Sequence, residues 1–157
     1  MAERSVVHGT FTIERVYDAA PARVFNAWAD PEAKARWFIG PADWQLVERR
    51  IDFRVGGREH LSGKRTDFTS TFDGVYHDIV PDQRIIYSYD MHLDRRHISV
   101  SLATVEFKAE GAGTRLVFTE QAVFLDGYDD GGGREHGTRV LLDQLAAEVH
   151  GQAGAKR

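Results

Sequence analysis

The sequence predicts one α+β domain in which a curved antiparallel sheet wraps around a long C-terminal helix. Two patterns favour this fold class. A series of short strand-like segments joined by tight turns runs from residue 44 to residue 122, and an amphipathic helical pattern follows it. The chain has 157 residues, 42% of them hydrophobic, which suits one domain with a single core.

The N-terminal part predicts one strand and two short helices. Residues 10–17 are rich in β-branched and aromatic types, which is typical of a strand, and residues 1–9 are expected to form a tail. Pro21 and Asp30-Pro31 then mark two helix starts, because proline suits the first helical turn and aspartate caps it. The second helix is expected to end near Trp37-Phe38.

Strand patterns and turn residues alternate through the middle of the chain. Ser62-Gly63-Lys64 and Glu110–Gly113 are the clearest turn signals. The predicted strands are residues 44–55, 58–61, 68–80, 84–93, 97–109 and 114–122. Beyond a glycine-rich loop, apolar residues recur every four positions, which predicts a helix from about Asp129 or Arg134 to Val149 and a tail at residues 150–157.

Composition excludes several classes of function. The absence of cysteine removes disulfides, thiolate nucleophiles and cysteine-ligated metals, and it fits a cytoplasmic protein. A formal charge of −4 argues against nucleic acid as a partner. No apolar run reaches the roughly 18–20 residues that span a bilayer, so we expect no membrane partner either.

An acidic cluster before the long helix invites a metal interpretation, which its spacing does not support. The cluster comprises Asp126, Asp129, Asp130, Glu135 and His136. The calcium-loop template fails, because Tyr128 stands at its third position and Gly137 at its twelfth. No HExxH motif is present for zinc. We therefore expect no metal and no cofactor, and the acids suit a helix N-terminus.

Alternation along the strands predicts an inner face that changes from apolar to polar toward one end of the sheet. One helix cannot close a curved sheet along its whole length, so a concave ligand site is expected at that end. The predicted ligand-binding residues are Trp37, Glu59, Phe72, Tyr76, Tyr87, Tyr89, Met91, His97, Ser99, Ser101, Phe118, Glu120, Gly137 and Leu141.

Two alternatives to simple binding stay open. His97 with Glu59 or Glu120 could act as a general acid–base pair in a cyclase- or hydrolase-like enzyme, if these side chains meet. Apolar residues on the outer sheet face, Ile98, Val100 and Leu102, favour a partner surface, most economically in a homodimer.

Several motifs between residues 10 and 149 also carry a family resemblance. They are Ala20–Trp28, Asp30-Pro31, Arg36–Phe38, Asp52–Gly57, Gly74–Pro81, Arg84–Tyr87, Gly113–Leu116, and Gly137 with Leu141–Leu145. Their order and spacing resemble the START/SRPBCC (Bet v 1-like) superfamily, in the group related to activators of the 90-kDa heat-shock protein ATPase. Thr138 departs from the pattern, because the family often carries tryptophan there.

This resemblance implies a helix-grip fold with a pocket between the sheet and the last helix. The superfamily includes binders of lipids and aromatic molecules, cyclase-like enzymes and co-chaperones, so it implies no single reaction. We expect a small hydrophobic or aromatic ligand, with a chaperone partner as a further alternative.

Overall fold

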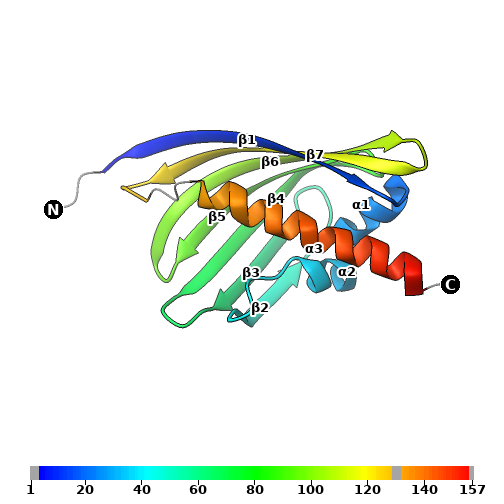
Figure 1. Cartoon of the computed structure of the whole chain (residues 1–157). Helices are drawn as coiled ribbons and strands as arrows, with labels where there is room; N and C mark the ends of the chain where they lie inside the picture. Colours follow the sequence, from blue (N-terminus) through cyan, green and yellow to red (C-terminus); the bar gives the residue numbers. More distant parts are fainter. Residues whose placement is uncertain (1–3, 129–131, 156–157) are drawn as a thin grey trace.

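Seven strands and three helices make up the protein, in a computed structural model that describes residues 4–128 and 132–155 (Figure 1). The elements are β1 (Val6–Tyr17), α1 (Pro21–Ala29), α2 (Pro31–Trp37), β2 (Gln45–Ile51), β3 (Arg58–Lys64), β4 (Thr69–Val80), β5 (Arg84–Leu93), β6 (Arg96–Glu110), β7 (Gly113–Leu125) and α3 (Gly133–Ala155). None of the helices in these two ranges is long and apolar enough to cross a membrane.

The strands form one antiparallel sheet in the order β1-β7-β6-β5-β4-β3-β2. Tight turns connect strands β4 to β7, as their turn residues predict. At the β5–β6 turn, Asp94 adopts a φ of 54°, a conformation that a short polar side chain tolerates. Its carboxylate also accepts a hydrogen bond from the Thr69 backbone, 3.0 Å away, which ties this turn to the start of β4.

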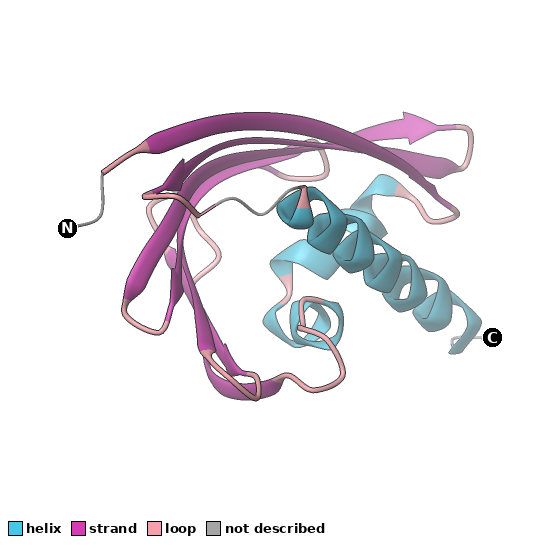
Figure 2. Ribbon diagram, turned by 60° about the vertical axis from the view of Figure 1, so that its left-hand side comes forward, coloured by secondary structure: helices cyan, strands magenta, loops and turns pink. Residues whose placement is uncertain are grey.

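The sheet curves around α3, while α1 and α2 cover the end of the sheet near the C-terminus of that helix (Figure 2). Asp30 caps α2 by accepting from the Glu32 backbone at 3.3 Å, and Pro31 follows it, as the sequence predicts. The closely packed core lies at this covered end, where α1 and α3 meet β6 and β7. Its fully buried members include Val24, Trp28, Val105, Leu116, Leu145 and Val149.

Several boundaries differ from the sequence prediction: β2 ends at Ile51 instead of residue 55, and β7 continues to Leu125 instead of ending at residue 122. β1 begins at Val6, because residues 6–9, predicted as a tail, pair with residues 122–125 of β7. β3 continues through Ser62-Gly63-Lys64, predicted as a turn, because these residues pair with β4. α3 continues to Ala155 instead of ending at Val149. The alternative helix start at Asp129 falls outside the described residues.

The outer sheet face carries two of the three apolar residues expected there. Val100 and Leu102 are each 38% exposed. Ile98 was expected beside them, but it is only 2% exposed and lies on the inner side of the sheet. The expected homodimer stays a prediction.

Candidate functional site

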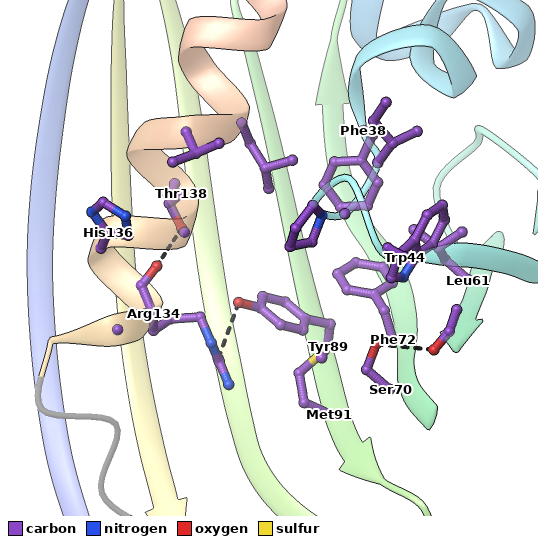
Figure 3. Close-up of a pocket in the computed structure, with 18 of the residues that line it drawn as sticks. Phe38, Trp44, Leu61, Ser70, Phe72, Tyr89, Met91, Arg134, His136 and Thr138 are labelled. Carbon is purple, nitrogen blue, oxygen red and sulfur yellow. Dashed lines mark hydrogen bonds between the residues drawn. The ribbon is translucent and has the colours of Figure 1, made fainter. Parts of the chain in front are cut away.

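A cavity of about 720 Å³ lies between the inner face of the sheet and the N-terminal half of α3. From the covered end, α1 and α2 contribute only Trp28 and Trp37 to its lining. Its walls come from strands β3 to β7, from the first turns of α3, and from the segment of residues 38–44 that links α2 to β2. Side chains distant in sequence therefore converge on one space (Figure 3).

Aromatic rings form a large part of the cavity wall. The pleat of β4 and β5 turns Phe72, Tyr87 and Tyr89 to the same face. Phe72 stacks on Tyr89 with ring centroids 4.6 Å apart, and its other neighbour, Phe38, meets it edge-to-face at 5.5 Å. Such contacts hold each ring in a fixed orientation, so the wall can stay ordered beside an open space.

Trp44 forms a further part of the wall and lies against two glycines. A Cβ at Gly63 would come within 1.7 Å of the Trp44 indole, and one at Gly40 within 2.4 Å. Both positions therefore need glycine while the indole stays in place. Figure 3 shows Trp44 on the same side of the cavity as Leu61 and Phe72.

A polar cluster closes the end of the cavity beneath the start of α3. The Arg134 guanidinium donates to the Ser99 hydroxyl at 2.8 Å, to Ser101 and Tyr89 at 3.2 Å, and to Glu120 at 3.3 Å. The Tyr89 hydroxyl donates to Glu120 at 2.6 Å. Burial alone would lower the pKa of Arg134, but Tyr89 and Glu120 outweigh it and raise that pKa. The cluster thus holds a charged pair in a largely dry setting.

A second buried ion pair lies outside the cavity lining. The Lys34 ammonium donates to Glu59 at 2.6 Å, and the Tyr76 hydroxyl donates to the same oxygen at 2.5 Å. The ammonium also lies 4.4 Å from the Phe38 ring centroid. Burial lowers the pKa of Lys34, an effect that Glu59 partly offsets. From behind the cavity wall, this ion pair therefore binds the Tyr76 hydroxyl and contacts the Phe38 ring.

Most residues predicted to bind a ligand do line the cavity. These are Trp37, Phe72, Tyr87, Tyr89, Met91, Phe118, Glu120, Gly137 and Leu141. Four others point inward but lie behind the wall: Ser99 and Ser101 bind Arg134, while Glu59 and Tyr76 belong to the Lys34 cluster. These placements leave the binding role itself a prediction.

His97 was predicted to face the cavity, and this prediction is wrong, because the structure places His97 on the opposite face of the sheet. Strict alternation along β6 would bring it inward, but a bulge inserts Ile98 between the pairs Met91↔Ser99 and His92↔His97. The extra residue turns Ile98 into the cavity and His97 outward. There it stacks on His92 at 4.6 Å and lies 2.8 Å from the Asp90 carboxylate. The catalytic pair of His97 with Glu59 or Glu120 therefore does not form.

Sequence reasoning missed Lys34, Trp44 and Arg134. Lys34 sits in a short helix whose charged residues would ordinarily face solvent, and the sequence carries no sign of its burial. Trp44 was assigned to a strand that in fact begins at Gln45. Arg134 was considered only as a helix start. The polar inner residues Ser99, Ser101 and Glu120 were a usable signal, because a buried carboxylate requires a cationic partner.

Tyr87 and Tyr89 in the cavity wall should make the folded protein less stable in alkali. Burial raises the pKa of Tyr87 and of Tyr89 well above the ordinary value of 10. The unfolded chain loses these protons near pH 10, so above that pH native stability should fall by up to about 1.4 kcal/mol per pH unit for each tyrosine. The lowered pKa of Lys34 acts in the opposite direction, but only below about pH 10.5.

Absorbance of phenolate, followed with circular dichroism through an alkaline titration, checks this expectation. The wall tyrosines should ionise together with unfolding, and Tyr87→Phe should remove one tyrosine from that step. Ionisation of all the tyrosines near pH 10 in a chain that is still folded would contradict it.

Comparison with known proteins identifies relatives across nearly the whole chain. The family model described as "Activator of Hsp90 ATPase homolog 1-like protein" matches residues 18–150. An uncharacterised protein from Rhizobium leguminosarum is 49% identical, with a TM-score of 0.91 over 94% of this chain and 98% of that one. No curated protein matches the chain.

Two further solved structures extend this comparison. A protein from Rhizobium loti is 48% identical, with a TM-score of 0.85 over 92% of this chain and 99% of that one. A more distant protein described as AHSA1-like, from Aeromonas hydrophila, is 21% identical, with a TM-score of 0.67 over 92% of this chain and 94% of that one. The likeness to the Aeromonas hydrophila protein supports the fold alone.

Proposed function

We propose that this chain, which belongs to the family of activator of Hsp90 ATPase homolog 1-like proteins, binds a small hydrophobic or aromatic molecule in the cavity between sheet and α3. The observation that carries the proposal is the 720 Å³ cavity with its wall of aromatic rings. Such a volume lies within the range of ordinary small-molecule sites.

Burial of apolar ligand surface would drive this binding. A ligand that buries about 400 Å² gains roughly 10 kcal/mol at 25 cal/mol per Å². Association costs at least about 4 kcal/mol, so the tightest dissociation constant that this burial allows is on the order of tens of micromolar. Native mass spectrometry of the protein purified from its own cell would reveal a co-purified molecule and the assembly state together. Thermal denaturation with a panel of apolar ligands should show raised melting temperatures.

Gly137 offers a test that separates binding from folding. It lines the cavity on α3, and a Cβ there would meet no atom within 4 Å. Gly137→Leu should therefore fill part of the cavity. It should lower, by at least about tenfold, the affinity of any ligand that raises the melting temperature of the wild type. The same change should stabilise the empty protein by about 0.5–1 kcal/mol, because leucine favours the helix over glycine.

Gly151→Leu is the matched control, since Gly151 lies on the same helix outside the cavity lining and its Cβ would also meet no atom within 4 Å. It should leave ligand affinity unchanged in isothermal calorimetry. Equal affinities in the wild type and Gly137→Leu would contradict binding at this end of α3.

Activation of a 90-kDa chaperone is the second candidate function, and membership of this family favours it. Its test is the ATPase rate of the purified chaperone with and without this protein. A rate increase that saturates with protein concentration would support the candidate, and an unchanged rate would contradict it.

A further inference from the structure

We propose that the ligand is an uncharged molecule whose apolar body fills the cavity and whose carbonyl or hydroxyl oxygen accepts a hydrogen bond from Tyr87. This inference rests on the proposed function and narrows it to a class of ligand. It makes Tyr87 the residue that orients the ligand against the sheet.

Tyr87 differs from the tyrosines on either side of it. Its ring centroid lies 6.0 Å from that of Tyr76 and 5.9 Å from that of Tyr89. The hydroxyls of both neighbours are occupied, because Tyr76 donates to Glu59 and Tyr89 to Glu120. Within residues 4–128 and 132–155, no protein group forms a hydrogen bond with the Tyr87 hydroxyl, and Tyr87, which is 5% exposed, lines the cavity.

The Tyr87 hydroxyl is therefore a donor at the cavity wall without a protein partner, and an acceptor on a ligand would take its hydrogen bond in place of water. The hydroxyl keeps its proton at neutral pH, since burial raises the pKa of Tyr87 well above 10. It therefore offers a neutral donor, and the matching ligand group is an oxygen acceptor. Carbonyl and hydroxyl oxygens both meet this requirement.

The charges around the cavity argue that this acceptor is neutral. Glu120 balances Arg134 in the wall, and Glu59 balances Lys34 behind it. Arg65, which also lines the cavity, pairs with Asp43 at 3.1 Å. A ligand carboxylate would lose its hydration on entering the cavity. The cations of the wall could not compensate this loss fully, because they are already paired with protein carboxylates. The cost of that transfer favours an uncharged ligand.

Three probes with one naphthalene frame test the inference by isothermal calorimetry. They are 2-acetylnaphthalene, which carries a ketone, 2-isopropylnaphthalene, which has the same shape without the acceptor, and 2-naphthoate, which is charged. In the wild type, the ketone should bind at least about tenfold more tightly than the naphthoate. In Tyr87→Phe, the ketone should lose about fivefold to tenfold in affinity, while the hydrocarbon is unchanged.

The Tyr87→Phe variant is expected to fold, because it removes a hydroxyl that has no protein partner, and its melting temperature should not fall. Tyr17→Phe is the matched control, since it removes a tyrosine hydroxyl outside the cavity lining, one that donates to the Leu142 carbonyl, and it should leave all three affinities unchanged. Equal losses of ketone affinity in the two variants would overturn the role of Tyr87.

The outcomes also separate this inference from the proposed function. If both neutral probes bind but Tyr87→Phe affects neither, the cavity binds apolar molecules and the inference about Tyr87 is wrong. Naphthoate as the tightest ligand would likewise overturn it. If none of the three probes binds the wild type, this inference and binding of aromatic ligands in the cavity both fail.

Discussion

Lys34→Met is expected to lower the free energy of unfolding by roughly 3–5 kcal/mol, because it leaves the Glu59 carboxylate buried without its cation. The side chains of Lys34 and Glu59 are only 3% and 6% exposed, and their charged atoms lie 2.6 Å apart. After the substitution, the Tyr76 hydroxyl still donates to that carboxylate, but the charge of the ammonium is gone. For a chain of this length, the loss corresponds to a drop in melting temperature of roughly 6–20 °C.

Urea denaturation with an unchanged m-value would measure this loss as a fall in the midpoint. Lys34→Met/Glu59→Gln should recover most of it, since glutamine is uncharged and still accepts from Tyr76. Lys108→Met is the matched control, because Lys108 forms an exposed pair with Glu106 at 3.4 Å and should change stability by less than about 1 kcal/mol. A Lys34→Met protein as stable as the control would show that the buried pair contributes nothing.

Strand periodicity and turn chemistry were sufficient to predict most of the fold. The predicted strand 84–93 coincides with β5, since Pro81-Asp82 before it and Asp94 after it are strong turn residues. The same alternation placed Tyr87, Tyr89 and Glu120 on the inner face, where the structure has them. Alternation with a period of two is enough to predict which side chains face inward wherever a strand pairs without a bulge.

The features that the sequence could not predict depend on contacts between distant segments. A one-residue bulge decides the side of His97, and no local residue pattern announces Ile98 as the insertion. Lys34 is buried because Glu59, 25 residues later, meets it. Gly63 looked like a turn residue, yet its small size serves the indole of Trp44 within a continuous strand. Each of these is set by tertiary packing.

The two buried ion pairs have a common arrangement that explains how the cavity stays open. Each carboxylate accepts from one cation and from one inner-face tyrosine: Glu59 from Tyr76, and Glu120 from Tyr89. These hydrogen bonds fix the tyrosine side chains against the sheet. Tyr89 lines the cavity, and a ring held in this way cannot rotate freely into the space beside it, so the wall resists collapse there without a ligand.

Arg134→Met tests that arrangement at the end of the cavity, and it should lower the free energy of unfolding by about 2–3 kcal/mol. Glu120, whose side chain is 1% exposed, would lose the guanidinium that pairs with it at 3.3 Å. The expected loss is smaller than for Lys34, since the Arg134 side chain is 15% exposed and water can reach part of the site. Affinity for 2-acetylnaphthalene should fall as well, because the Tyr89 ring loses one of the groups that hold its hydroxyl.

Arg139→Met on the same helix is the control, since its pair with Glu135 is an exposed i,i+4 contact worth at most about 0.5 kcal/mol. Arg134→Lys should recover only part of the loss, because an ammonium cannot reach Ser99, Ser101 and Glu120 together as the guanidinium fork does. The Arg134 effect should also persist in 1 M salt, where the exposed pair is screened. If the Arg134→Met and Arg134→Lys proteins are equally stable and bind the ketone equally well, the charged guanidinium of Arg134 does not hold the wall. The aliphatic part of the side chain alone would then explain its burial.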